Sequence, residues 1–145
     1  MQFAPKYPEV LAAAKQLAEE RPEAVTQHLM YKYTYDTVQT PEPFDIIAHL
    51  FAKFDFTPSP QWLYENNHRV ARSWMNDLIA DWAVQVFFSR LQRASDRGLT
   101  WSKAVKLAES QTKQYYRSFE AQTMIALMSG AHYYPGSTKP EDVLK

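Results

Sequence analysis

The chain has only three glycines in 145 residues, beside nine prolines. Glycine supplies the positive φ angles of tight hairpin turns and the close backbone approach that phosphate-cradling loops need, whereas proline is common at helix starts and in helix breaks. A chain with so little glycine is not expected to form many hairpins, a Rossmann turn or a phosphate-binding loop. This composition favours helices joined by proline-containing breaks.

The rest of the composition indicates a folded protein of one domain. Hydrophobic residues make up 46% of the chain and aromatic residues 14%, which is enough apolar surface to form a core. The sequence contains no internal repeat and no low-complexity segment. We therefore expect an all-α fold, a single helical domain over residues 1–145 built as a bundle of about five to six helices, two of them long, with loop-like ends at 1–7 and 131–145.

The spacing of apolar residues places the first helices. It predicts one helix over 8–20, between two prolines, and a short one near 46–54. The segment 22–40 is ambiguous, because three tyrosines from Tyr31 onward occupy alternate positions, as in a strand. No partner strand is evident in the sequence, so we favour a helix there.

Two long helices are expected in the second half of the chain. One runs from about Gln61 to Arg97 and is ended by Gly98, and its middle is apolar nearly all round, which indicates burial on most sides. The other begins after Thr100 as its N-cap and continues to about Ser129.

The last of these helices is amphipathic. Its apolar face, which includes Trp101, Tyr115 and Phe119, is expected to pack inward. Further on, Thr138 and Glu141 have the spacing of a small capping box, which predicts a helical turn in a frayed tail.

The net charge of zero conceals an uneven distribution along the chain. Residues 1–65 carry five basic and nine acidic side chains, a net charge of −4, whereas residues 66–119 carry nine basic and four acidic ones, a net charge of +5. The remaining residues carry −1. The question for function is therefore what the basic segment faces.

The cations of the basic segment recur at helical spacing. In the last long helix they fall within an arc of about 80°, at 100° per residue, and the two long helices could present their rows side by side. Rows spaced one turn apart suit a phosphate backbone, because neighbouring side chains reach successive phosphates. The candidate nucleic-acid-binding residues are Arg69, Arg72, Arg90, Arg93, Arg97, Lys103, Lys106, Lys113 and Arg117.

These rows also have a simpler interpretation, since an amphipathic helix has a solvated face that is often basic without binding anything. For the aromatic side chains near the cations, a binding role and a purely structural role are likewise both open. Tyr133 and Tyr134, between Gly130 and Pro135, are candidates for stacking on bases, whereas the place of Tyr115 on the apolar face favours core packing.

Catalytic and metal sites find little support. The chain has no cysteine, which excludes disulfides, a thiol nucleophile and cysteine-bound metal clusters. Glu65 and His68 have the spacing used in di-iron bundles, but that motif occurs once instead of twice, and Asp45 with His49 is only a two-residue pattern. We expect no enzyme activity, no metal and no cofactor.

No segment of the sequence predicts export or membrane insertion. Residues 1–10 lack the apolar stretch of a signal peptide, and no window reaches about 18 consecutive apolar residues. We expect a cytoplasmic protein without a membrane partner.

The chain resembles the small subunit of type I CRISPR surveillance complexes, known as Cascade. The resemblance covers about residues 8–129 and rests on the small size, the helix layout and the basic rows between Arg69 and Arg117. It implies a non-catalytic subunit of a ribonucleoprotein that lies in several copies beside other subunits of the effector complex. It also implies contact, without sequence specificity, with the backbone of the guide–target RNA–DNA duplex or of the displaced single-stranded DNA.

The near-neutral overall charge differs from that of a free-standing nucleic-acid binder. It fits a subunit whose acidic N-terminal half meets a protein neighbour. The alternative is a helical protein–protein adaptor whose basic face meets an acidic partner, with no nucleic acid involved.

Overall fold

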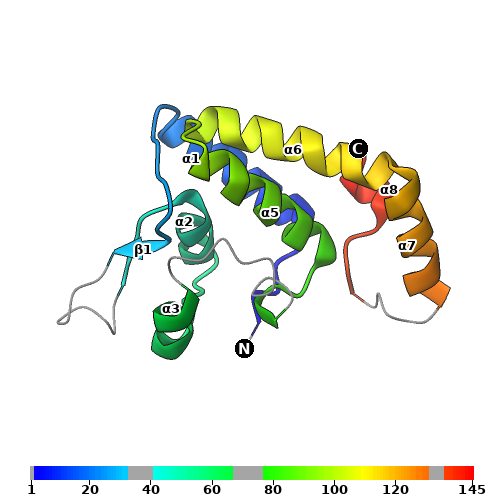
Figure 1. The fold of residues 1–145 in the computed structure, drawn as a ribbon, viewed down its shortest axis with the longest axis horizontal. Coiled ribbons are helices and arrows are strands. Elements are labelled where there is room, and N and C mark those ends of the chain that lie inside the picture. Colours follow the sequence, from blue (N-terminus) through cyan, green and yellow to red (C-terminus); the bar gives the residue numbers. More distant parts are fainter. Residues whose placement is uncertain (1, 33–40, 67–76, 131–135) are drawn as a thin grey trace.

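The computed structural model describes residues 2–32, 41–66, 77–130 and 136–145. Within these ranges the chain forms seven helices and one antiparallel pair of two-residue strands, so the all-α prediction is confirmed (Figure 1). The elements are α1 (Tyr7–Glu20), β1 (Tyr31–Lys32), β2 (Glu42–Pro43), α2 (Ile46–Lys53), α3 (Pro60–Asn66), α5 (Trp82–Asp96), α6 (Trp101–Arg117), α7 (Phe119–Gly130) and α8 (Pro140–Val143).

Helices α5 and α6 form a central helical hairpin, and α1 packs against both α6 and α2 (Figure 1). Two residues shape the turn of the hairpin as predicted. Gly98 follows the end of α5 with a φ of 89°, and the Thr100 hydroxyl caps α6 by accepting a hydrogen bond from the N–H of Lys103 at 3.3 Å. Because a side chain at Gly98 would be strained and would meet the Gln27 amide at 3.1 Å, this turn depends on glycine.

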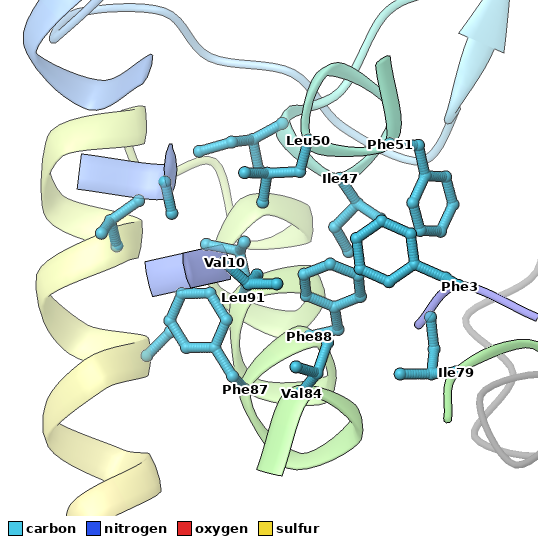
Figure 2. Close-up of a cluster of buried hydrophobic side chains, with 14 of the residues drawn as sticks. Phe3, Val10, Ile47, Leu50, Phe51, Ile79, Val84, Phe87, Phe88 and Leu91 are labelled. Carbon is cyan, nitrogen blue, oxygen red and sulfur yellow. The ribbon is translucent and has the colours of Figure 1, made fainter. Parts of the chain in front are cut away.

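The hydrophobic core lies where α1, α2 and the α5–α6 hairpin meet (Figure 2). The ring centroid of Phe3 lies 5.0 Å from that of Phe51 on α2 and 5.9 Å from that of Phe88 on α5. None of these three side chains is more than 1% exposed. Since burial of a phenylalanine contributes roughly 1.5–3 kcal/mol, this cluster is a principal source of stability.

The N-terminal segment is non-helical, as expected, but it is firmly attached to the core. The Phe3 N–H donates to the carbonyl of Leu78 at 2.7 Å, and the Phe3 carbonyl accepts from the N–H of Ala80 at 3.0 Å. These bonds form a parallel bridge between Phe3 and Ile79. They hold the Phe3 ring in the core.

The same bridge shows that the continuous helix predicted over 61–97 is wrong. Helix α5 begins only after Asp81, whose carboxylate accepts from the N–H of Ala83 at 3.0 Å. Just before Asp81, the Leu78 carbonyl and the Ala80 N–H are bonded to Phe3, and Ile79 and Ala80 are not helical. Residues 67–76 lie outside the described residues.

The helix favoured over 22–40 is wrong for residues 22–32, which are the described part of it. They form a loop that ends in β1, where Tyr31 lies opposite Pro43 and Lys32 opposite Glu42 in β2. The partner strand has no clear sequence pattern, because it is two residues long and contains a proline, which has no N–H to donate.

The long helix predicted after Thr100 is divided at Ser118 into α6 and α7. Ser118 has φ −70° and ψ 150°, and its hydroxyl accepts from the N–H of Ala121 at 3.1 Å. Serine favours this N-cap conformation because its side chain replaces a helical hydrogen bond. Helix α7 therefore leaves the line of α6 and projects from the rest of the fold (Figure 1).

In the described part of the C-terminal end, residues 136–139 and 144–145 are non-helical, as predicted, and α8 confirms the predicted helical turn, but the segment is docked and not frayed. Val143 in α8 is 1% exposed and belongs to the core. The predicted capping box is also wrong, because the N-cap of α8 is Lys139 and the Thr138 hydroxyl donates to Asp81. Residues 131–135 lie outside the described residues.

Candidate nucleic-acid interface

A shallow pocket of about 400 Å³ lies between α5, α6 and the start of α7. Helix α5 contributes a row of three arginines, in which each side chain lies one helical turn from the next. Amide and hydroxyl groups line the other side. We call this site the arginine pocket, and its polar lining consists of Arg90, Arg93, Arg97, Gln111, Gln114, Tyr115, Ser118 and Glu120.

The positive charge of the arginine pocket is largely uncompensated. Neither Arg93 nor Arg97 forms an ion pair with a carboxylate in the part of the chain that the structure describes. Asp96, next to Arg97 in sequence, binds the loop before β1 instead. Its Oδ1 accepts a hydrogen bond from the N–H of His28 at 2.9 Å. The guanidinium groups of Arg93 and Arg97 thus remain available for an anion.

Tyr115 forms the aromatic wall of the pocket. Its ring lies 5.4 Å from that of Trp82, and the Arg90 guanidinium lies 5.5 Å from its centroid. Burial raises the pKa of Tyr115, the Glu120 carboxylate raises it further and Arg90 lowers it, so the net direction is upward. The phenol therefore stays protonated near neutral pH, and the ring supports Arg90 by a cation–π contact.

The cations of α6 lie on a different surface from the arginines. Lys103, Lys106 and Arg117 are exposed and Lys113 is half-buried, on the side of α6 that faces away from the core. We call these four residues the α6 stripe. At 100° per residue the stripe lies about a quarter turn around α6 from the arginine pocket.

One member of the α6 stripe borders a second groove. Lys106 lines a space of about 500 Å³ between α1 and α6, together with Lys15 and Glu109. The Lys15 Nζ pairs there with Glu109 Oε2 at 3.0 Å, so that groove carries charges of both signs. The two cationic rows, expected to lie side by side, therefore lie on different sides of α6 and do not form one flat surface.

Four of the aromatic and basic candidates cannot be placed. Arg69 and Arg72 fall in 67–76, and Tyr133 and Tyr134 fall in 131–135, which lie outside the described residues.

One feature of this region does not follow from the predicted helices, the exposure of Phe119. Expected on the inward face of a long helix, this side chain is instead 86% exposed, because the break at Ser118 redirects the chain. Its neighbours Ser118 and Glu120 both line the arginine pocket. The signal was present in the sequence, since a serine followed by an acidic residue in the next turn is typical of a helix start.

Asp45 and His49, a weak metal pattern in the sequence, have structural contacts instead. The Asp45 carboxylate caps α2 by accepting from the N–H of Ala48 at 2.8 Å. The His49 Nδ1 lies 2.8 Å from the Asp45 backbone carbonyl, and the ring packs against the edge of Trp101 with centroids 5.0 Å apart. The two side chains therefore do not present a shared pair of ligands.

The Glu65 and His68 pattern is not tested, because His68 lies outside the described residues. Within the described ranges, no group of three or more histidine, aspartate and glutamate side chains is placed to hold a metal ion. In the same ranges no helix is both long and apolar enough to span a bilayer.

Comparisons of the chain with protein-family models, with curated proteins and with solved structures found no match.

Proposed function

We propose that this protein is a non-catalytic subunit of a ribonucleoprotein complex and holds a nucleic-acid backbone without reading its sequence. The observation that carries the proposal is the row of Arg90, Arg93 and Arg97 in one concave site, with two of the three guanidinium groups unpaired among the described residues. The resemblance to the Cascade small subunit is the source of the proposed setting in a larger complex.

Arginine suits this role because its planar guanidinium binds phosphate through two parallel hydrogen bonds and stays charged at every physiological pH. In the arginine pocket the side-chain amides of Gln111 and Gln114 add neutral donors to the same space. Such contacts go to phosphate oxygens, which every nucleotide carries, so they fix position without selecting a sequence. The α6 stripe would extend the contact to further phosphates around α6.

The acidic half of the chain is compatible with this assignment. Two of its cations are neutralised within the fold, Lys15 by Glu109 at 3.0 Å and Lys53 by Glu20 at 3.6 Å. Among the described residues, Arg93, Arg97 and the α6 stripe form no ion pair, and they lie on adjoining sides of the α5–α6 hairpin. A backbone that is steered by charge would meet these sides of the hairpin first.

The test is fluorescence anisotropy with labelled oligonucleotides of unrelated sequence, between about 50 and 200 mM salt. We expect Arg93→Gln combined with Arg97→Gln to weaken binding about tenfold or more for every sequence. The slope of log affinity against log salt should become shallower by about 0.7 for each arginine removed. Lys139→Gln, which removes an exposed cation outside both rows, is the matched control.

A second variant tests the α6 stripe separately. Lys106→Glu with Lys113→Glu and Arg117→Glu should weaken binding further and again equally for unrelated sequences. The same two variants are then compared within the complex purified from native cells. Unchanged nucleic-acid affinity there would overturn the proposal.

Polyglutamate in the same titration identifies the alternative function. Tight binding of this acidic polymer, abolished by the arginine substitutions, together with no binding of oligonucleotides, would establish the adaptor with an acidic protein partner.

A further inference from the structure

We propose that the arginine pocket takes a phosphate of a single strand while the adjoining base stacks on the ring of Phe119. This inference rests on the proposed function and deepens it. It assigns Phe119 as a nucleic-acid-binding residue and predicts that the site prefers single strands to duplexes.

The first observation is the exposure of Phe119. In the described part of the chain three large hydrophobic side chains are markedly exposed, Phe119 at 86%, Tyr64 at 83% and Val25 at 48%. Burial of a phenylalanine is strongly favourable, so an almost fully exposed ring at a defined place calls for an explanation. Of the three, only Phe119 is the direct sequence neighbour of residues that line the arginine pocket, Ser118 and Glu120.

The second observation is the position of Phe119 in the chain, between two residues that line the arginine pocket. Phe119 stands between Ser118 and Glu120, both of which line the pocket, and consecutive Cα atoms are only about 3.8 Å apart. A nucleotide joins its base to its phosphate through one sugar, and we infer that this span bridges the arginines and the Phe119 ring. Cationic grooves combined with exposed aromatic rings are the usual means of binding single strands.

The third observation is that this placement depends on a local device. The Ser118 hydroxyl donates to the Tyr115 carbonyl at 2.7 Å and accepts from the N–H of Ala121 at 3.1 Å. These bonds stabilise the break between α6 and α7 and keep Phe119 out of the core. Ser118, which lines the pocket, thus also determines that the Phe119 ring is exposed.

Base stacking also distinguishes single-stranded nucleic acid from a duplex. In a duplex the bases are already stacked and paired inside the helix, so a side chain at a pocket rim cannot reach their faces without disrupting the pairs. In a single strand the faces are accessible. The phosphates are present in both, which means that the arginines alone cannot make this distinction.

The experiment compares four ligands of equal length at low salt: oligothymidylate, oligouridylate, an abasic strand with the same phosphates, and a DNA duplex. We expect Phe119→Leu to weaken oligothymidylate and oligouridylate binding about tenfold and to leave abasic-strand and duplex binding unchanged. Phe119→Trp should retain the single-strand affinity. Tyr64→Leu, which removes an equally exposed ring on α3, is the matched control and should change nothing.

The outcomes separate this inference from the proposed function. Arg93→Gln should weaken the binding of all four ligands, because each carries phosphates. If Phe119→Leu changes nothing, or weakens abasic and normal strands alike, base stacking on Phe119 is disproved while backbone binding stands. If Arg93→Gln with Arg97→Gln also leaves every affinity unchanged, the proposed function fails as well.

Discussion

Thr138 and Asp81, 57 residues apart, share a buried hydrogen bond in which the threonine hydroxyl donates to the carboxylate. The same carboxylate also accepts from the N–H of Thr138 at 3.1 Å and from the N–H of Tyr7 at 2.9 Å. Asp81 is fully buried and caps α5. One carboxylate therefore joins the start of α1, the start of α5 and the segment that leads into α8.

This junction predicts a large loss of stability when either partner is removed. Thr138→Val keeps the shape but leaves the carboxylate with one partner fewer, so the free energy of unfolding should fall by about 1–3 kcal/mol. Asp81→Ala removes the acceptor for both segments and should cost about 3 kcal/mol or more. Urea unfolding measures both values.

Asp142→Asn is the matched control for these variants, since Asp142 forms only a surface ion pair with Lys145. It should change stability by less than about 0.5 kcal/mol. A similarly small effect of Asp81→Ala would show that the buried junction does not hold the C-terminal segment.

A second prediction concerns the N-terminal anchor. Phe3→Ala removes a ring that packs against Phe51 and Phe88, and it should lower the free energy of unfolding by about 3–5 kcal/mol. The backbone bridge to Ile79 does not depend on the side chain, so the loss reports the ring alone. Gln2→Ala, at an exposed neighbouring position, should change thermal unfolding little.

A third prediction concerns pH. Burial raises the pKa of Asp45 to about 7, with a smaller contribution from the charge of Asp96, while the N–H of Ala48 opposes the shift. An unfolded aspartate titrates near about 4, so the folded state binds the proton more tightly. This contribution to stability is complete below about pH 4, falls as the pH rises, and is lost above about pH 7.

Asp45→Asn tests this directly, because asparagine is also a good N-cap but does not titrate. Between about pH 5 and 8 the stability of the parent protein should fall by about 2 kcal/mol more than that of the variant. Parallel curves for the two proteins would contradict the prediction. All other titrating groups are retained, so the difference isolates Asp45.

The predictable parts of the fold are those whose causes lie within a few residues. The spacing of apolar residues located α1 and α2, and Gly98 and Thr100 located the turn between α5 and α6. The same reasoning placed Arg90, Arg93 and Arg97 on one face of a helix, which the arginine pocket confirms. Helical periodicity and capping are local properties, so they can be read without a structure.

The parts that could not be predicted depend on partners that are distant in the chain. Phe3 reaches the backbone around Ile79 and ends the helix expected there. Tyr31 pairs with Pro43, and no periodicity in the sequence predicts this pairing. The local pattern favours a helix near Ile79 and is ambiguous near Tyr31, but each choice is made by backbone pairing with a residue distant in the sequence.

The candidate site divides in the same way. The low glycine content and the helical spacing of the cations were sufficient to predict a helical protein with basic faces. Only the packing of α5 against α6, and the break at Ser118, decide that three arginines share a pocket and that Phe119, between two of its lining residues, is exposed to water. The physical reason is that periodicity determines which face of a helix a side chain occupies, whereas the neighbouring elements determine what that face meets.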